Sequence, residues 1–386
     1  MCLPSQMNTN KLKLKFIFIL GTTEIGGAEK QAILLGNELQ KIQSYKVFFI
    51  LFGNKTGKAA LRLEKLGIPY RIQKMPDSFF TIVKLYKTLL YIFRLRLFKP
   101  TVLLPYTNGP NICTSLIWKY TGAKACFWNQ RDEGIGLINN SITRKAVSNA
   151  TCFIANSLGS RDILVKMFPT IEQRIFLVNN GIETIKINVN RQEWRKRFSF
   201  SENDYLICMV ANLHKDKDHE TLIRAFKKIV DDSNCSDKEK FKLLLVGRHD
   251  DKYNYLLKLS KDLNLLERTY FLNEIESIPD ILNAVDISVL CTFSEGLSNV
   301  AIESMIVGVP FTGSRIDGIV EVVGSDYTAY LANPRDSEDL AAKILFFRNN
   351  QQVTKELVKR NKERATNLFS VDRLYYDSLN LFLSYL

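Results

Sequence analysis

The stretch ISVLCTFSEGLSNVAIESMIVGVPF, residues 287–311, holds the local pattern that decides the fold. A short β-branched run leads into a turn with glycine and serine, a helical segment follows, and a second apolar run begins after Gly308. Strand, turn, helix and strand in this order are typical of a parallel sheet with crossover helices. A helix that begins after such a turn presents backbone N–H groups and the positive end of its dipole, and both suit a diphosphate.

The same alternation runs through the rest of the chain in two blocks. In the first half, strand-like runs separated by helical segments occur at 14–20, 46–52, 101–106, 125–128, 152–156 and 175–180. In the second half, such runs occur at 205–211, 242–247, 269–273 and 287–292. Residues 184–198 lack clear periodicity and are interpreted as a linker. We therefore predict an α/β protein with two Rossmann-like, doubly wound domains facing a cleft, because ligands of open α/β sheets bind at the carboxyl ends of the strands.

Length and composition agree with two globular domains. The chain has 386 residues, of which 46% are hydrophobic and 24% are charged, and this balance excludes a disordered, collagen-like or coiled-coil protein. Its seven cysteines are scattered and contain no C-x-x-C pair. This usage is typical of a reducing compartment and indicates neither a disulfide framework nor a zinc knuckle.

The charge is unevenly distributed. Residues 1–190 contain 26 Lys and Arg against 10 Asp and Glu, a net charge of +16, whereas residues 191–386 contain 27 against 30, a net charge of −3. Such asymmetry favours a polyanionic partner for the first half: a nucleic acid, an anionic membrane surface or a phosphorylated substrate. The alternative is a charge that serves solubility and has no partner.

No export signal or membrane span is expected. The polar amino-terminal stretch leads into only a short apolar run, Phe16 to Leu20, which is too short for a signal peptide. The longest apolar stretch, Phe79 to Phe98, is interrupted by Lys84, Lys87, Arg94 and Arg96 and cannot cross a bilayer as a simple span. We expect a cytoplasmic protein.

Two glutamates mark the segment quoted first. Glu303 follows Glu295 by eight positions and would lie about a turn and a half into the helix. A carboxylate there can accept both hydroxyls of a ribose, as acidic residues do in dinucleotide-binding folds. The alternative is an ordinary βα unit with two surface glutamates. The preceding strand, the glycine and the following GVP loop favour the nucleotide site.

At this point the sequence resembles the retaining glycosyltransferases of the GT-B fold, family 4, also described as glycosyl transferases group 1. The resemblance covers nearly the whole chain, because its segments occur in the family's order. They are GGAEKQ (26–31), LVNNGIE (177–183), MVANLHKDKDHETLIRAF (209–226), KLLLVG (242–247) and IPDILNAVDISVLCTFSEGLSNVAIESMIVGVPF (278–311).

The resemblance implies a role for each matched position. Glu303 would hold the ribose of the donor nucleotide, and Glu295 would approach the hydroxyls of the donor sugar. Lys217 would neutralise the leaving phosphate, where a fixed cation stabilises the developing negative charge. Glycines let a loop approach the phosphates or the acceptor closely. The remaining donor-binding positions are the glycines of the first-domain loop, the residue just beyond the first strand of the second domain, and the backbone that cradles the diphosphate, namely Gly26, Gly27, Asn212, Leu297, Ser298 and Asn299.

The chain departs from the family at two positions. Asn212 stands where the family usually has an arginine, so Arg248, Lys215 or His214 would replace that cation. The usual first-domain histidine is also missing, because all three histidines lie in the second half. The corresponding segment is FWNQRDEG, where Gln130, Arg131 and Asp132 offer donors and an acceptor. We expect Arg131 to be catalytic; the alternative is a structural arginine paired with Asp132 or Glu133.

We expect neither a metal nor a cofactor. The triplet DKD at 216–218 matches the D-x-D metal motif of a different transferase fold, but here it precedes a helix at His219. Asp218 is better interpreted as a helix cap with acidic residues in the first turn. The resemblance also implies that protein cations take the place of a metal.

One apolar helix in the basic half has two interpretations. Lys84, Lys87, Tyr91 and Arg94 fall on one face of a helix. The face could meet anionic lipid head groups and bring the enzyme to a lipid-linked acceptor. It could equally be the solvated face of a helix that covers the sheet. The charge of +16 favours the membrane.

The resemblance implies a retaining transferase that moves a hexose or N-acetylhexosamine from a UDP- or GDP-sugar to a hydroxyl of a lipid-linked glycan in cell-surface polysaccharide synthesis. Residues 1–185 would bind the acceptor and residues 186–368 the nucleotide-sugar, with a final helix in 369–386 packed back on the first domain. The enzyme would sit peripherally on the inner face of the membrane. A sugar-nucleotide epimerase of the same fold is one alternative, although the carboxylate and histidine set expected in its first domain is not found. A basic nucleic-acid-binding protein is the other, but the chain has no helix-turn-helix, RNP or zinc-finger pattern, so no nucleic-acid partner is expected.

Overall fold

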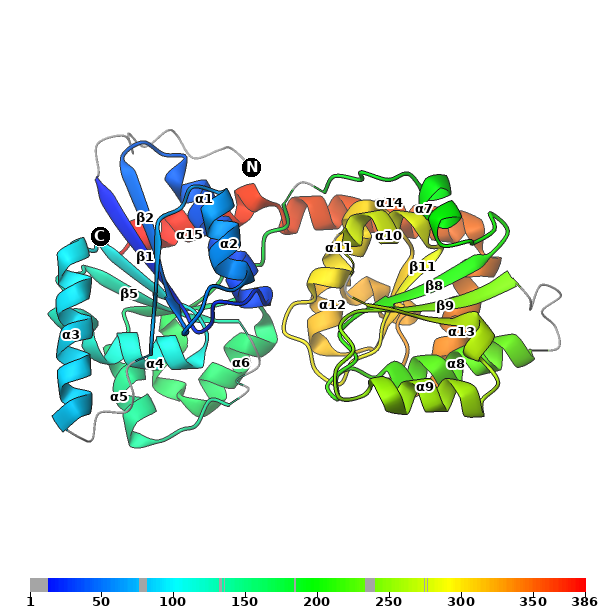
Figure 1. The fold of residues 1–386 in the computed structure, drawn as a ribbon, viewed down its shortest axis with the longest axis horizontal. Helices are drawn as coiled ribbons and strands as arrows, with labels where there is room; N and C mark the ends of the chain where they lie inside the picture. Colours follow the sequence, from blue (N-terminus) through cyan, green and yellow to red (C-terminus); the bar gives the residue numbers. More distant parts are fainter. Residues whose placement is uncertain are drawn as a thin grey trace. The chain divides into compact units, whose positions relative to one another are not determined.

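The computed structural model describes residues 13–75, 82–131, 134, 136–183, 185–232, 240–273, 275 and 277–386. The chain divides into two compact units, one formed by Met1–Gly181 with Val371–Leu386 and the other by Ile182–Ser370 (Figure 1). Each unit has a parallel sheet joined by helices, which confirms the two doubly wound domains predicted from the alternation of strands and helices.

The first unit contains a parallel sheet in the order β3-β2-β1-β4-β5-β6-β7. Its strands are β1 (Leu14–Leu20), β2 (Tyr45–Phe52), β3 (Tyr70–Gln73), β4 (Val102–Pro105), β5 (Ala125–Gln130), β6 (Cys152–Ala155) and β7 (Ile175–Leu177). Its helices are α1 (Gly27–Gln40), α2 (Lys58–Lys65), α3 (Ile82–Phe98), α4 (Asn108–Ile117), α5 (Ser141–Asn149), α6 (Leu158–Met167) and α15 (Val371–Leu383), with short 3₁₀ turns η2 (Trp118–Tyr120) and η3 (Pro169–Arg174).

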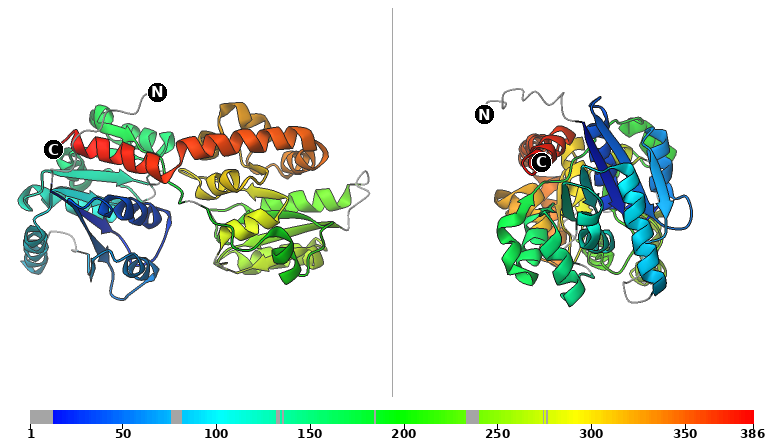
Figure 2. Two further views of the ribbon diagram at one scale, coloured as in Figure 1. Left: turned by 90° about the horizontal axis from the view of Figure 1, so that it is seen from above. Right: turned by 90° about the vertical axis from the view of Figure 1, so that its left-hand side faces the viewer.

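Alternate residues of β1 face two different cores, as the pleat of a strand requires. Phe16 and Phe18 pack in one core with side chains of α1, α2 and α15. Ile17 and Ile19 pack in another core with side chains of α3 and α4. The last helix therefore belongs to the first unit, where α15 returns to lie beside its strands (red in Figure 2).

The second unit contains a parallel sheet in the order β10-β9-β8-β11-β12. Its strands are β8 (Tyr205–Val210), β9 (Phe241–Val246), β10 (Thr269–Leu272), β11 (Ile287–Leu290) and β12 (Phe311–Gly313). Its helices are α7 (Arg191–Arg197), α8 (His219–Asp231), α9 (Tyr253–Asp262), α10 (Ile278–Ala284), α11 (Asn299–Val307), α12 (Asp317–Val323), α13 (Ser337–Asn349) and α14 (Gln351–Leu368), with 3₁₀ turns η5 (Leu266–Arg268) and η6 (Ser325–Tyr330).

The interpretation of residues 184–198 as an irregular linker is wrong for its second half. Residues 191–197 form α7, and Arg195 in this helix is fully buried. Its guanidinium donates to the carbonyl of Ala284 at 2.9 Å and to the carboxylate of Asp286 at 2.8 Å. The helix gave no apolar periodicity because its two buried side chains are Trp194 and a charged arginine.

Within the described residues, no helix combines the length and apolarity that crossing a membrane requires. This includes α3, the helix with the longest apolar run.

Candidate functional site

Three loops of the second unit meet at the carboxyl edge of its sheet. They follow β8, β11 and β12, which are neighbours in the sheet. Ligands of open α/β sheets bind at this edge. Two of these loops, 211–218 after β8 and 291–298 after β11, carry the candidate residues. We call these two loops, together with the first turn of α11, the β8–β11 edge.

The structure brings Lys217 and Glu295 together at this edge. Their side chains form an ion pair, and each is 23% exposed. The amine of Lys217 also lies 3.5 Å from the hydroxyl oxygen of Thr292. The loops themselves are paired, because Lys217 and Thr292 form an antiparallel β-bridge. A cation and a carboxylate from distant segments are therefore held side by side at the ligand-binding edge.

Hydrogen bonds of the backbone hold the first loop in place. The amide of Asp218 donates to the carbonyl of Cys291 at 3.0 Å. The carboxylate of Asp218 caps α8 by accepting from the amide of Thr221 at 3.2 Å. The interpretation of Asp218 as a helix cap is thus confirmed. Within the part of the chain that the structure describes, no group of three or more His, Cys, Asp or Glu side chains is arranged to hold a metal ion.

The N-terminus of α11 lies at the same edge. Ser298 is its N-cap and accepts from the amide of Ala301 at 3.3 Å. Leu297, Ser298 and Glu303 are buried. Asn299 is the first residue of α11. The first amides of a helix have no partner within it, so this turn can receive an anion.

Gly318 was not singled out from the sequence, yet it supports the turn that carries Glu295. A Cβ at Gly318 would lie 1.9 Å from the carbonyl oxygen of Glu295 and 2.2 Å from that of Gly296. The backbone of α12 therefore packs directly against the Glu295–Gly296 turn. Ser314 adds a second support, because its hydroxyl accepts from the amide of Thr292 at 3.1 Å. Neither contact has a signal in the local sequence.

Asn212 is hydrogen-bonded to the loop that follows β9. Its side-chain oxygen accepts from the amide of Arg248 at 3.2 Å. The two loops approach closely at Gly247, which has a φ of +152° and whose Cβ would lie 2.3 Å from the carbonyl oxygen of Ala211. Of the cations proposed to replace the family's arginine, Arg248 is paired with Asp250 at 2.6 Å, His214 lies 3.0 Å from Asp216, and Lys215 is exposed.

The glycine pair of the first unit lies where α1 begins. Gly26 is the N-cap and Gly27 the first residue of this helix, and both are exposed. The amide of Gly26 donates to Glu29 Oε2 at 3.1 Å, and a Cβ at Gly26 would lie 2.9 Å from that oxygen. Burial raises the pKa of Glu29. The absence of a side chain at Gly26 thus serves the helix cap as well as any close approach by a ligand.

Arg131 follows β5 at the carboxyl edge of the first sheet. Its guanidinium donates to Asn129 Oδ1 at 3.1 Å and to Asn180 Oδ1 at 3.4 Å. It also lies over the ring of Tyr106, 5.1 Å from the centroid. The alternative partners Asp132 and Glu133 lie outside the described residues. Asn129, Asn180 and Tyr106, which position Arg131, were not identified from the sequence, although each lies at or just beyond the end of a strand.

Helix α3 does not present the face that the helical wheel predicted. Tyr91 is buried against the sheet, so its placement on a solvated basic face is wrong. Lys87 is exposed and Arg94 is partly buried, whereas the side chain of Lys84 lies outside the described part of the chain. Beside the exposed Lys87 and Arg96, the described part of this helix exposes four large apolar side chains, namely Tyr86, Leu89, Phe93 and Leu97.

Solved structures share the fold of this chain. HepE of Anabaena, crystallised with UDP and glucose, matches with a TM-score of 0.81 at 18% identity, and the match covers 97% of this chain and 100% of HepE. WaaG, a glycosyltransferase involved in lipopolysaccharide biosynthesis, matches with a TM-score of 0.67 at 14% identity, covering 95% and 99% of the two chains. The protein therefore has the GT-B fold, as predicted.

A family model matches the sequence of the second unit. Residues 190–366 match the family described as Glycosyl transferases group 1. The second unit is therefore similar to this family of glycosyltransferases, which confirms the resemblance.

Curated relatives match over different lengths. The N-acetyl-α-D-glucosaminyl L-malate synthase of Bacillus anthracis is 26% identical over 204 residues, so the match spans about half of each protein, 51% of this chain and 52% of the synthase. A protein of Campylobacter jejuni is 23% identical over 379 residues, 95% of this chain and 98% of its own. Its name is GalNAc-α-(1→4)-GalNAc-α-(1→3)-diNAcBac-PP-undecaprenol α-1,4-N-acetyl-D-galactosaminyltransferase.

Proposed function

We propose that the protein transfers a hexose or N-acetylhexosamine, with retention of configuration, from a UDP- or GDP-sugar to a hydroxyl of a lipid-linked glycan. The observation that carries this proposal is the Lys217–Glu295 ion pair beside the capped N-terminus of α11. This arrangement offers a cation, a carboxylate and helix amides at the edge of a parallel sheet where nucleotides bind.

Each group has a role toward the donor. The first turn of α11 receives the diphosphate, and Glu303 accepts the ribose hydroxyls. Lys217 turns from Glu295 to the phosphates when the donor binds, which releases Glu295 to meet the hydroxyls of the sugar. Lys217 then stabilises the charge that develops as the nucleoside diphosphate departs. Lys217 thus supplies the cation that a metal would otherwise provide.

The transfer itself exchanges one bond to the anomeric carbon for another. The bond between that carbon and the diphosphate oxygen breaks, and the acceptor oxygen forms its bond on the same face of the sugar. The proton of the acceptor hydroxyl goes to the leaving phosphate. Arg131, held by Asn129 and Asn180, is the candidate catalytic group of the first unit. Gly26 and Gly27 are exposed at the start of α1, so the loop before this helix stays open to the phosphates or the acceptor.

Two observations support a lipid-linked acceptor and a membrane surface. The Campylobacter relative is named for an undecaprenol-linked glycan, and a relative in Escherichia coli, 23% identical over 218 residues, is named for a diphosphoundecaprenol-linked acceptor. Residues 1–190 carry a net charge of +16, which suits an anionic membrane surface.

Binding of nucleotides tests the proposal. The protein is screened with UDP, GDP, ADP and their sugars by thermal shift, in which a ligand at 100 times its Kd adds about 2.7 kcal/mol of stability. Calorimetry then compares the wild type with Glu303→Ala, for which we expect nucleotide affinity to fall by about 1.5–3 kcal/mol, the contribution of hydrogen bonds to a charged group. Glu295→Ala should reduce transfer more than it reduces binding of the free nucleotide.

The control variant is Glu363→Ala, which removes an exposed carboxylate from α14 of the same unit. This variant should bind nucleotide as the wild type does. An unchanged affinity of Glu303→Ala for every nucleotide and nucleotide-sugar would remove the donor site from the β8–β11 edge.

A further inference from the structure

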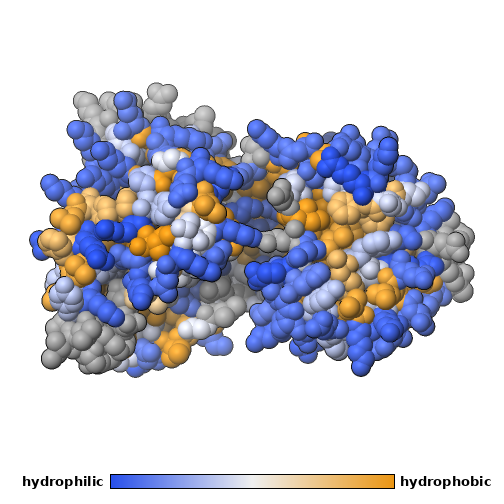
Figure 3. All heavy atoms as spheres, in the orientation of Figure 1, coloured by the Kyte–Doolittle hydropathy of each residue, from blue (hydrophilic) through white to orange (hydrophobic). Residues whose placement is uncertain are grey.

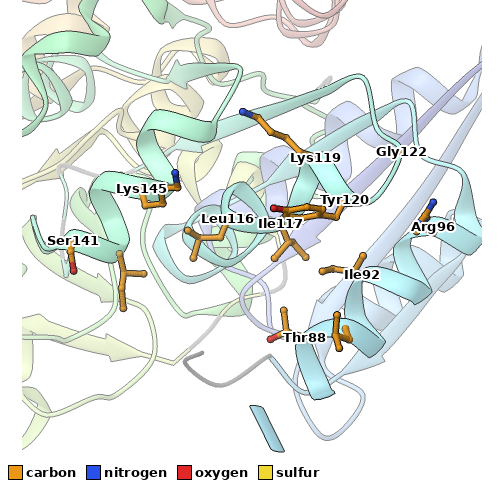
Figure 4. Close-up of a pocket in the computed structure, with 12 residues that line it drawn as sticks. Thr88, Ile92, Arg96, Leu116, Ile117, Lys119, Tyr120, Gly122, Ser141 and Lys145 are labelled. Carbon is orange, nitrogen blue, oxygen red and sulfur yellow. The ribbon is translucent and has the colours of Figure 1, made fainter. Parts of the chain in front are cut away.

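A pocket of about 920 Å³ lies within the first unit, between α3, α4 and α5. Its apolar walls come from Ile92 of α3, Leu116 and Ile117 of α4, and Ile142 of α5, and Tyr120 of η2 also lines it. Figure 4 shows Ile92, Leu116, Ile117 and Tyr120 gathered together, with the amines of Lys119 and Lys145 directed away from them. A pocket of this size and lining accommodates a mainly apolar ligand.

An apolar stripe on α3 continues the pocket onto the surface. Tyr86, Leu89, Phe93 and Leu97 are 66%, 56%, 58% and 66% exposed and recur at the spacing of one helix face. Leu89 belongs to both the stripe and the lining of the pocket. Hydrophobic side chains gather over part of α3 on the face drawn in Figure 3. A continuous apolar surface on an otherwise charged unit marks a site of interaction.

All the charged side chains that line the pocket among the described residues are cationic. Arg96, Lys119 and Lys145 line it together with the apolar side chains. From Ser78 to Arg131 the sequence contains eight Lys and Arg and no Asp or Glu, and α5 likewise has no acidic residue. The occupant must therefore combine hydrocarbon with negative charge. A nucleic acid or an acidic peptide would leave the apolar walls in water, whereas an anionic lipid satisfies both features.

We propose that this pocket binds a hydrocarbon chain of an anionic phospholipid from the bilayer, whose phosphate is neutralised by Arg96, Lys119 and Lys145. The α3 stripe enters the boundary between head groups and acyl chains, and one lipid leaves the plane of its neighbours to fill the pocket. The inference builds on the membrane attachment in the proposed function but needs no sugar donor. Its failure and that of the transfer reaction are therefore distinguishable.

The full-length protein is incubated with phosphatidylglycerol or phosphatidylcholine vesicles without donor, and co-sedimentation measures attachment. Native mass spectrometry then counts the lipids retained by the recovered protein. Ile142→Trp fills the pocket from the partly exposed first turn of α5. Phe93→Ser with Leu97→Ser removes stripe residues that do not line the pocket. Lys119→Glu with Lys145→Glu reverses exposed charges at the pocket, and Lys46→Glu with Lys65→Glu is the matched control elsewhere in the unit.

We expect one retained phosphatidylglycerol per chain and none from phosphatidylcholine. Ile142→Trp should lower lipid retention at least about tenfold while vesicle attachment persists, because the stripe and the cations remain. The Lys119 and Lys145 double variant should lose lipid retention and vesicle attachment, whereas the Lys46 and Lys65 control should keep both properties. If Ile142→Trp does not fold, the double variant and its control decide the matter, since all four lysines are exposed.

Three results would overturn the proposal. The first is that no lipid is retained by the wild type. The second is equal retention by the wild type and folded Ile142→Trp, or by the Lys119 and Lys145 double variant and its control. The third comes from a parallel incubation with vesicles that also contain a lipid diphosphate glycan: retention of that glycan with no retention of phosphatidylglycerol would assign the pocket to the acceptor.

Discussion

Replacing Gly318 by alanine should reduce the transfer activity, although Gly318 is not one of the residues proposed to contact the donor. A Cβ at this position would lie 1.9 Å from the carbonyl oxygen of Glu295, whereas ordinary contact begins near 3.4 Å. The Glu295–Gly296 turn or α12 must therefore move by about 1.5 Å. Overpacking of this kind costs about 1–3 kcal/mol of stability. A displacement of about 1 Å at a catalytic group can cost roughly 100-fold in rate, so we expect a loss of this order in kcat/KM.

The assay combines urea unfolding, calorimetry with the nucleotide that binds the wild type, and steady-state transfer. Gly109→Ala is the matched control, because Gly109 is likewise the second residue of a helix, and a Cβ there meets only the flexible Met75 side chain, at 3.1 Å. The control should keep wild-type stability and nucleotide affinity. Wild-type kcat/KM in Gly318→Ala would refute the reasoning, because it would show that the turn can retreat without displacing Glu295.

Three further outcomes follow from named contacts. Lys217→Ala should lower kcat more than it raises the donor KM, because a cation that contacts a leaving phosphate acts most strongly in the transition state. A change confined to KM would assign Lys217 to ground-state binding. Arg195→Met should lower the free energy of unfolding in urea by about 1–3 kcal/mol, since it leaves the buried carbonyl of Ala284 and those of Ser201 and Asp204 without this donor, while Arg191 stays paired with Asp286. Exposed Arg197→Met should cost less than about 0.5 kcal/mol, and similar losses in the two variants would contradict the buried pairing. Burial lowers the pKa of His219 to about 4, below the unfolded value of about 6.5. Between these two pH values the unfolded state binds a proton that the folded state does not bind. The free energy of unfolding should therefore fall as the pH drops from 6.5 to 4. Urea unfolding at pH 7.5 and 5 should show this fall in the wild type and a shallower one in His219→Asn, and equal slopes would exclude the histidine as the cause.

The local pattern around Glu295 was sufficient to predict much of the second unit. Strand, turn and helix from Ile287 to Val307 are specified by neighbours in sequence, since hydrophobic runs and caps act over a few residues. Ser298 caps α11, and Asp218 caps α8 as its position suggested. The proposed roles of Glu303 and Lys217 stay predictions, because they concern a ligand.

The contacts between segments could not be predicted in the same way. Lys217 meets Glu295 because β8 and β11 are neighbours in the sheet, and the sequence of one strand does not state which strand lies beside it. Gly318 is indistinguishable in sequence from any glycine near a helix start until α12 is packed on the Glu295–Gly296 turn. The supports of the site are therefore tertiary even where its chemical groups are visible in the sequence.

The sequence by itself determined the resemblance to a family of glycosyltransferases and the two doubly wound units. It also determined which carboxylates and which cation are proposed for the donor. All of these depend on residue type and on order along the chain. Only the tertiary structure decided that Tyr91 faces the core while Leu89, Phe93 and Leu97 face outward, and that Arg195 is buried. When a helix has apolar residues on most of its faces, its sequence does not indicate which face packs on the sheet. An arginine is buried only where carbonyls and a carboxylate from other segments accept hydrogen bonds from it. These outcomes depend on atoms distant in sequence, and folding alone brings them together.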